Sequence, residues 1–306
     1  MRLVSCSSYL PEIKVENKEI ANKFNIEEEY IVKRTGIRQR YFAKDETIEE
    51  MATMAVQRLI RKTKIDVQEI GLIVVATTST NRLMPGIANY VQKKINIKKC
   101  IAFDVLAGCS GYINAVDIAQ MYIDSGKIEK AIVIGVDILS KYTNQDDINT
   151  AIILADGAGA TLFESSNNNL YFSNIESIPD FKNILGNVSN SKISMDGLAI
   201  YKYAVSETVT NVRELLEKSG EKLENIKYIV PHQSNLKIIK AIANRLGISM
   251  EKVFSNIDNV GNTFCASIPI ALEEMQQNKL LNNGDKIILL GYGGGLNTGS
   301  ILLKID

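Results

Sequence analysis

Short runs of aliphatic and β-branched residues alternate along the chain with longer stretches whose apolar residues recur at helical spacing. The short runs predict strands at Leu72–Ala76, Ala102–Val105, Ala131–Val136, Gly159–Phe163, Tyr228–Val230, Lys286–Gly291 and Ser300–Lys304. The longer stretches predict helices at Ile48–Lys62, Gly86–Lys94, Ser110–Asp124, Ser206–Ser219, Leu236–Leu246 and Ser267–Gln277. This alternation is typical of an α/β fold whose sheets are covered by helices on both faces.

The two halves of the chain share a similar pattern. Ala115 and Ala271, in two similar predicted helices, are 156 residues apart. The same offset separates two pairs of predicted strands, residues 131–135 from 287–291 and, within one residue, Leu72–Ala76 from Tyr228–His232. An internal duplication explains this offset, but strands rich in Ile, Val and Ala also match by chance.

A segment with little periodicity separates the halves. Ser165–Gly197 is rich in Asn and Ser, which favours a junction and loops over a site. We therefore predict two similar α/β domains, at residues 1–165 and 166–306.

Length and charge exclude several classes of protein. A chain of 306 residues is about two average domains long and can bury a sizeable core without disulfides or metals. Its 35 basic and 35 acidic residues balance, so the chain lacks the overall charge of a nucleic-acid-binding protein. No apolar run approaches the roughly 18 residues that a membrane span needs. We expect a globular protein that binds neither nucleic acid nor membranes.

The cysteine and histidine content limits which kinds of active site the chain can form. The four cysteines follow no C-x-x-C spacing, and the N-terminus lacks the apolar core of a secretion signal. We therefore expect reduced thiols and a cytoplasmic location. The only histidine is His232. A single histidine excludes or argues strongly against any active site that needs two histidines, including those of most zinc hydrolases. We expect no metal site.

Cys109 is the candidate nucleophile. It follows a predicted strand, lies in a turn between Gly108 and Gly111, and precedes an amphipathic helix. The positive end of a helix dipole lowers the pKa of a thiol at such a place and raises its thiolate fraction. A buried structural cysteine would fit the same position, because free cysteines are among the most buried residues.

His232 and Asn262 also stand just before predicted helices. His232 follows a strand, and ligands gather at the carboxyl ends of strands in α/β sheets. Lone histidines are nevertheless usually surface or core residues, and Asn262 can simply cap a helix. The glycine-rich segments at 156–160 and 291–296 complete no phosphate-binding motif. The second indicates backbone that comes very near another group, and its N–H groups can form half of an oxyanion hole.

Together, Cys109, His232 and Asn262 with their surroundings closely resemble the β-ketoacyl-acyl-carrier-protein synthase III family of the thiolase superfamily. The resemblance covers nearly the whole chain. It includes Tyr-Ile-Val-Lys-Arg-Thr-Gly-Ile-Arg from Tyr30, Val-Pro-His-Gln-Ser-Asn-Leu from Val230 and Gly-Asn-Thr from Gly261. It implies the five-layer αβαβα thiolase fold of two duplicated domains, with the site between them. The lone histidine matches the Cys-His-Asn set of this family and not the Cys-His-His set of elongating synthases.

By this resemblance the reaction is a two-stage condensation. Cys109 takes an acyl group from an acyl-thioester, expected to be acyl-CoA, with the backbone N–H groups of Cys109 and Gly294 holding the oxyanion. Malonyl-acyl-carrier protein then loses carbon dioxide and attacks the acyl group, while His232 and Asn262 donate hydrogen bonds to its thioester oxygen. Acyl-CoA is thus a substrate, and no permanently bound cofactor is expected.

The resemblance also implies a CoA channel, a carrier-protein surface and a homodimer. Arg34, Tyr30, Asn235 and Gly197 match channel positions, although Tyr30 and Ile148 replace a tryptophan and an arginine that clamp the adenine in relatives. Met84 replaces a phenylalanine that closes the acyl pocket across the dimer, so donors longer than acetyl are compatible with the pocket. The carrier-protein surface consists of Lys237, Lys240 and Arg245.

Two alternatives remain. The altered adenine clamp is compatible with an acyltransferase or thioesterase that passes the acyl group from Cys109 to an alcohol, an amine or water. A non-catalytic acyl-binding protein is the other alternative, although all three catalytic positions are filled.

Overall fold

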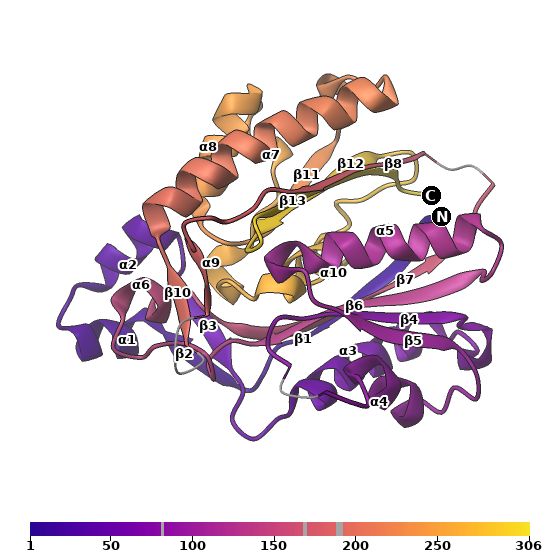
Figure 1. The fold of residues 1–306 in the computed structure, drawn as a ribbon, viewed down its shortest axis with the longest axis horizontal. Helices are drawn as coiled ribbons and strands as arrows, with labels where there is room; N and C mark the ends of the chain where they lie inside the picture. The colour runs from indigo at the N-terminus through magenta and orange to yellow at the C-terminus, as the bar shows by residue number, and fades with distance from the viewer. Residues whose placement is uncertain (81–82, 168–169, 188–191) are drawn as a thin grey trace.

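The computed structural model describes residues 1–80, 83–167, 170–187 and 192–306, which form five layers (Figure 1). Two sheets lie face to face with a pair of helices packed between them, and two further pairs of helices cover the outer faces. The predicted five-layer αβαβα fold is confirmed.

The first sheet has the strand order β1-β7-β6-β4-β5. In that order its strands are Arg2–Tyr9, Asp156–Glu164, Lys130–Ile138, Leu72–Ala76 and Ile101–Val105. β4 is parallel to β5 and β6, whereas β7 is antiparallel to both of its neighbours. The outer face of this sheet is covered by α3 (Ile48–Thr63) and α4 (Ile87–Lys94).

The second sheet has the strand order β11-β12-β13-β8. In that order its strands are Tyr228–Pro231, Lys286–Gly293, Asn297–Lys304 and Tyr171–Ser177. Its outer face is covered by α7 (Gly197–Ser219) and α8 (Leu236–Leu246). The central layer between the two sheets consists of α5 (Gly111–Asp124) and α10 (Ser267–Gln277).

Most of the remaining elements lie at the left in Figure 1. Two short pairs of strands are β2 (Ile13–Glu16) with β3 (Gln39–Phe42), and β9 (Leu185–Asn187) with β10 (Ile193–Met195). The other α-helices are α1 (Asn17–Phe24), α2 (Glu28–Thr35), α6 (Ile148–Ala151) and α9 (Ile257–Val260). The single-turn 3-10 helices η2 (Gly108–Ser110) and η5 (Phe264–Ala266) lead directly into α5 and α10.

The pairing of the strands supports an internal repeat. Leu72 of β4 lies opposite Ala131 of β6, and Tyr228 of β11 lies opposite Ile287 of β12. Both members of the second pair come 156 residues after those of the first, so the parallel register itself is repeated. The domain boundary at residue 165 stays a prediction, because α5 and α10 share one core with both sheets.

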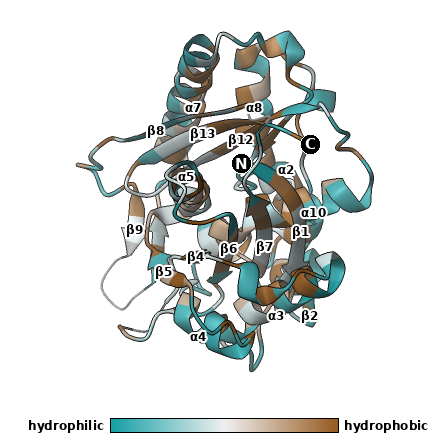
Figure 2. Cartoon of the chain, turned by 90° about the vertical axis from the view of Figure 1, so that its right-hand side faces the viewer, coloured by the Kyte–Doolittle hydropathy of each residue, from teal (hydrophilic) through white to brown (hydrophobic). Residues whose placement is uncertain are grey.

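Apolar residues concentrate in the sheets and in the helix faces turned toward them, as Figure 2 shows. The central helix α5 is packed on both sides, and five of its residues are completely buried: Tyr112, Ile113, Ala115, Val116 and Ala119. Burial of apolar surface on this scale is the main source of folding stability.

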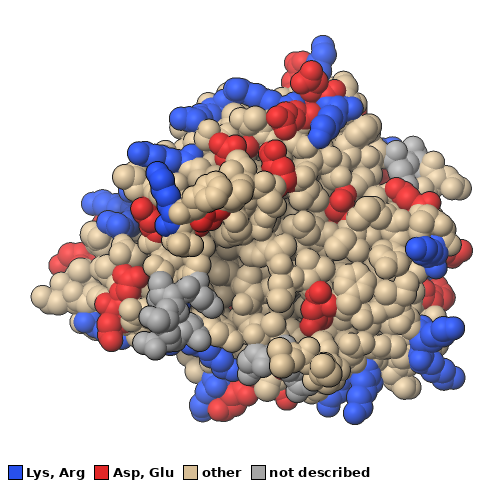
Figure 3. Space-filling view, viewed as in Figure 1, with Lys and Arg blue, Asp and Glu red and all other residues tan. Residues whose placement is uncertain are grey.

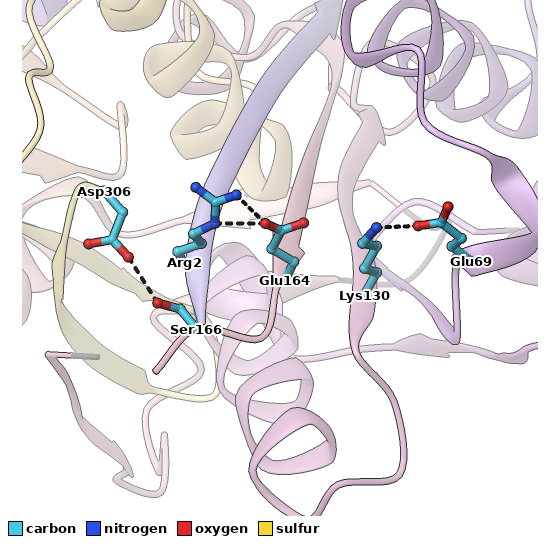
Figure 4. A network of polar contacts seen from close by, with 6 residues as sticks. All are labelled: Arg2, Glu69, Lys130, Glu164, Ser166 and Asp306. Carbon is cyan, nitrogen blue, oxygen red and sulfur yellow. Dashed lines mark hydrogen bonds and ion pairs between the residues drawn. The ribbon is translucent and has the colours of Figure 1, made fainter. Parts of the chain in front are cut away.

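Charged residues lie at one end of the first sheet, at the amino ends of β1 and β6 and the carboxyl end of β7. Figure 4 shows Arg2 paired with Glu164 and Lys130 paired with Glu69. These side chains are partly exposed, so each pair contributes at most about 1 kcal/mol. The carboxyl ends of the parallel strands, at Ala76 and Val105, are the end where ligands bind in such sheets.

We expect Gly135→Ala to destabilise the fold. A Cβ at Gly135 of β6 would lie 2.0 Å from the carbonyl oxygen of Cys265, so β6 and η5 could not keep their contact. The expected loss is about 3 kcal/mol or more of unfolding free energy, measured by urea unfolding. Gly197→Ala is the matched control, because no described atom outside its own helix lies within 4 Å of the position that its methyl group would take. Equal stability of both variants would contradict the tight packing at Gly135.

Two expectations from the pattern were wrong, and some strands were missed. The helix predicted at Ser206–Ser219 begins at Gly197, where the side chain of Asp196 accepts hydrogen bonds from two backbone N–H groups. The segment predicted as loops contains β8, β9 and β10. β1 was missed because its serines hide the apolar pattern; Ser5, Ser7 and Ser8 are buried.

Candidate active site

A cavity of about 350 Å³ lies between the two halves of the molecule. Its wall includes Cys109, His232 and Asn262, which come from three distant parts of the sequence. Each follows or precedes a strand or helix end, as the sequence predicted, and each is at most 4% exposed. The fold therefore brings the three predicted catalytic residues to one buried cavity.

Cys109 lies in η2, in a turn that the backbone of Gly293 and Gly294 approaches closely. Gly108 has a φ of 59°, a left-handed conformation that favours glycine. A Cβ at Gly293 of β12 would lie 2.6 Å from Cβ and 2.9 Å from Sγ of Cys109. The expectation that the glycine-rich segment 291–296 comes very near another group is thus confirmed.

The thiol of Cys109 is not the low-pKa group that its helix position predicted. Burial and the neighbouring carboxylate of Asp137 raise the pKa of Cys109 to about 12. Backbone hydrogen bonds from Gly294 and from Cys109 itself act in the opposite direction but do not outweigh them. The prediction failed because the sequence shows the helix end but not the loss of water around the sulfur. In the free protein the thiol is therefore protonated at neutral pH.

We expect the alkylation rate of Cys109 to rise about tenfold per pH unit between pH 7 and pH 10. The reagent reacts with the thiolate, and the thiolate fraction keeps growing below a pKa of about 12. The measurement is the rate of iodoacetamide labelling at Cys109, followed by peptide mass spectrometry. A rate that levels off near pH 7 would instead show that the helix dipole dominates.

His232 is a neutral imidazole with one nitrogen held in place. Complete burial lowers the pKa of His232 to about 3. Its Nδ1 lies 2.7 Å from Oγ of Ser267, the first residue of α10, and its ring packs edge-on against Tyr292, with ring centroids 5.4 Å apart. When the hydroxyl of Ser267 donates to Nδ1, the proton of the imidazole is on Nε2. His232 can then act as a hydrogen-bond donor toward the cavity.

Asn262 is oriented by its own loop. Its Oδ1 accepts a hydrogen bond from the backbone N–H of Phe264 at 3.1 Å, and its backbone pairs with Ile153 and Ala155. The side chain is not the cap of α10, which begins at Ser267. Because the oxygen is engaged within the loop, the Nδ2 amide is the part that can donate to a ligand.

The channel residues lie around the outer part of the cavity. Arg34, Asn235 and Gly197 line it, and Asn235 donates to the carbonyl oxygen of Arg34 at 3.2 Å. Tyr30 is absent from the wall; its hydroxyl accepts from Nη1 of Arg34 at 3.0 Å. Asn149, which the sequence did not single out, accepts from the other nitrogen of Arg34 at 3.3 Å. The mouth of the cavity is therefore polar.

Of the predicted carrier-protein residues and Met84, only Lys237 also lines the cavity. Lys237 and Lys240 are exposed on α8 and face a second groove, lined also by Lys33 and Arg38. Arg245 is exposed near the end of α8 and lines neither this groove nor the cavity. Met84 is 83% exposed and lines no described cavity of the single chain, so its role in an acyl pocket stays a prediction.

Asp137 is a site residue that the sequence reasoning missed. Its buried carboxylate accepts hydrogen bonds from the Thr77–Ser79 segment and from the backbone N–H of Cys265, which fixes the loop next to Asn262. Burial raises the pKa of Asp137 despite these bonds. An acidic residue within the apolar run of β6 was the available signal.

The thiol of Cys265 donates to the carbonyl oxygen of Gly108 and lines no described cavity, consistent with packing.

Within residues 1–80, 83–167, 170–187 and 192–306, no group of three or more His, Cys, Asp or Glu side chains is arranged to hold a metal ion. None of the helices in that part of the chain has the length and apolar character that a membrane span requires.

Known proteins match both the sequence and this structure. A model of 3-oxoacyl-[acyl-carrier-protein] synthase III matches residues 103–178, and a model of the C-terminal part of that synthase matches residues 216–305. The β-ketoacyl-[acyl-carrier-protein] synthase III of Clostridium acetobutylicum is 37% identical over 320 residues, which cover 99% of this chain and 98% of that protein.

Solved structures agree with these matches. The crystal structure of 3-oxoacyl-[acyl-carrier-protein] synthase III from Aquifex aeolicus is 37% identical, with a TM-score of 0.96 and 99% of each chain covered. The Thermus thermophilus synthase III structure is 31% identical, with a TM-score of 0.96 over 100% of this chain and 99% of that one. The chain therefore belongs to the β-ketoacyl-acyl-carrier-protein synthase III family of condensing enzymes.

Proposed function

We propose that this protein is an acyltransferase that condenses an acyl group from acyl-CoA with malonyl-acyl-carrier protein, the step that initiates fatty-acid or related acyl-chain synthesis. The observation that carries this proposal is the meeting of Cys109, His232 and Asn262 in one buried cavity. The names of the full-length relatives support the same reaction.

In the first stage Cys109 is the nucleophile. Its sulfur attacks the thioester carbon, the bond to the CoA sulfur breaks, and the proton of the Cys109 thiol leaves with CoA. The oxyanion formed in this step accepts hydrogen bonds from the backbone N–H groups of Cys109 and Gly294. The backbone N–H groups of Gly294 and of Cys109 both act to lower the pKa of the Cys109 thiol, so both lie close to the reacting sulfur, which supports this assignment.

In the second stage His232 and Asn262 stabilise an enolate. Malonyl-acyl-carrier protein loses carbon dioxide, the resulting carbanion attacks the acyl carbon, and Cys109 leaves as the thiolate and takes up a proton from the solvent. Negative charge develops on the thioester oxygen of the malonyl group during decarboxylation. A neutral Nε2–H of His232 and the Nδ2 amide of Asn262 would donate to that oxygen, and such a donor is worth about 3 kcal/mol.

The polar mouth suits the arm shared by CoA and the carrier protein. Arg34 supplies a cation for phosphate, and Asn235 and Gly197 border the path of the arm toward Cys109. Lys237, Lys240 and Arg245 on α8 would attract an acidic carrier protein, in a manner weakened by salt.

The test is incubation with acyl-CoA and malonyl-acyl-carrier protein, with detection of carbon dioxide and of the β-ketoacyl product. Both must form if the proposal is right. An acyl adduct on Cys109 that passes to an alcohol, an amine or water without carbon dioxide would identify the acyltransferase or thioesterase alternative. Absence of any adduct would favour an acyl-binding protein.

One face of the molecule suits a second copy of the chain. β5 is the edge strand of its sheet, and all five of its residues are only partly buried. Leu106 directly after β5 is 68% exposed, and Met121 on the adjacent α5 is 56% exposed. On the face in Figure 3, which has α5 in front, charged side chains lie mainly toward the rim. An unpaired strand edge beside exposed apolar residues is typical of a protein interface.

We therefore expect a symmetric homodimer at micromolar concentration, measured by sedimentation. Leu106→Lys should weaken it, because the variant places a charge on the proposed interface. A monomer as the only species of the unaltered protein would contradict the proposal.

A further inference from the structure

Two cavities meet at Cys109. One is the cavity of about 350 Å³, which we call the channel. The other is a second cavity of about 190 Å³, which we call the chamber, and Cys109 lines it too. Among the described residues, three line both spaces: Cys109, Leu185 and Phe264. Leu185 and Phe264 therefore border both spaces next to Cys109.

Both spaces are largely apolar, and they differ in the charged and amide side chains of their walls. The channel has Arg34, Asn149 and Asn235 in its wall. The chamber is lined largely by apolar side chains, including Leu139 and Ile193, and the described part of the chain contributes no charged residue to it. An acyl chain attached to Cys109 is apolar, whereas the arm of the incoming malonyl thioester is polar. The acyl chain thus fits the chamber, and the polar arm fits the channel.

Phe264 is held between these spaces in an unusual conformation. Its φ is 45°, in the left-handed region that bulky residues rarely adopt and that costs about 1–3 kcal/mol. The hydrogen bond from its N–H to Oδ1 of Asn262 helps to keep it there. The side chain is 6% exposed and belongs to an apolar cluster with Cys109, Leu139, Leu154 and Ile193. A strained residue at this place indicates a function for its ring.

We propose that Phe264 is the partition that sets donor length, confining the acyl group of Cys109 to the chamber and keeping it out of the channel that the malonyl arm needs. This rests on the proposed role of Cys109 as the acyl carrier. Donors that fill the chamber load and condense, and longer donors are rejected because the ring of Phe264 closes the wall shared with the channel.

If Phe264 is this partition, then donor length and condensation with the malonyl arm both depend on its ring. Removing the ring joins the chamber to the channel, so longer chains load on Cys109. The same chains then extend into the space of the malonyl arm and compete with it. Phe264 should therefore limit donor length and protect condensation at once, which a residue that only packs would not do.

The experiment compares the unaltered protein with Phe264→Ala and Phe264→Leu, using straight-chain acyl-CoA donors from acetyl to dodecanoyl. Adduct formation on Cys109 is followed by intact-protein mass spectrometry. For donors longer than the unaltered protein accepts, we expect Phe264→Ala to load about tenfold faster or more, and Phe264→Leu to load at an intermediate rate. With these donors the KM for malonyl-acyl-carrier protein should rise in Phe264→Ala.

Leu154→Ala is the matched control. Leu154 is buried in the same apolar cluster but lines neither cavity, so its loss lowers stability without changing the donor profile. An unchanged donor profile in folded Phe264→Ala or Phe264→Leu, with adducts still formed, overturns the partition alone. A change of the same size in Leu154→Ala also overturns it. Absence of an adduct in the unaltered protein overturns the proposed function, and the partition with it.

Discussion

Cys109→Ser is expected to abolish acyl loading, with a loss of about a thousandfold or more. The hydroxyl has nearly the shape of the thiol, so the turn at η2 and the contact with Gly293 remain. It is, however, a far weaker nucleophile without a base to activate it. His232 is not arranged as that base when the proton of its ring is on Nε2. The measurement is the mass of the intact protein after exposure to acyl-CoA.

Cys265→Ser is the matched control for this loss. Its side chain is completely buried, and a serine hydroxyl can keep the hydrogen bond to the carbonyl oxygen of Gly108. We expect this variant to load at nearly the unaltered rate, with the adduct mapped to Cys109. An adduct that persists in Cys109→Ser, or one that vanishes in Cys265→Ser, would contradict the assignment of the nucleophile.

Asn262→Ala is expected to separate the two half-reactions. In the proposed mechanism, loading uses the sulfur of Cys109 and the backbone N–H groups of Cys109 and Gly294, so it should remain largely intact. Decarboxylation of the malonyl thioester loses a hydrogen-bond donor and should slow by about a hundredfold to a thousandfold. Loading is measured by the adduct, and condensation by release of carbon dioxide from malonyl-acyl-carrier protein.

A second variant, Asn262→Asp, distinguishes a catalytic role of Asn262 from a purely structural role in its loop. Alanine also removes the oxygen that accepts from the N–H of Phe264, and so leaves a buried donor without this partner. Asn262→Asp keeps that oxygen and the side-chain volume but replaces the Nδ2 donor. We expect both variants to lose condensation. Recovery of condensation in Asn262→Asp would show that Asn262 only holds the loop, and equal loss of both half-reactions in Asn262→Ala would contradict its assigned role.

The repeated unit was visible in the sequence because its strands are continuous apolar runs. Leu72–Ala76 is buried on both faces, and its predicted bounds match β4. The helices α8 and α10 also have the predicted bounds, because a periodic apolar face ends sharply at each of their termini. β1 was missed, since α3 and α10 cover it on both sides and its buried serines look like a surface segment in the sequence alone.

The protonation state of Cys109 could not be predicted from the local sequence pattern. The sequence places Cys109 before a helix, which predicts a lowered pKa. Asp137 is distant in sequence, but the pairing of β6 with β4 brings it near the site, and burial removes the water that would stabilise a thiolate. Together they reverse the direction of the shift.

The sequence by itself indicated the α/β fold class and the repeated β-α-β unit, because these depend on local periodicity. Its resemblance to a known family, and not a local pattern, pointed to Cys109 as nucleophile and to His232 and Asn262 as donors. The tertiary structure alone decided that Cys109 is protonated in the free protein, that Ser267 and the N–H of Phe264 orient His232 and Asn262, and that Phe264 lines two cavities. These properties depend on desolvation and on contacts between residues far apart in the chain, and no local pattern records them.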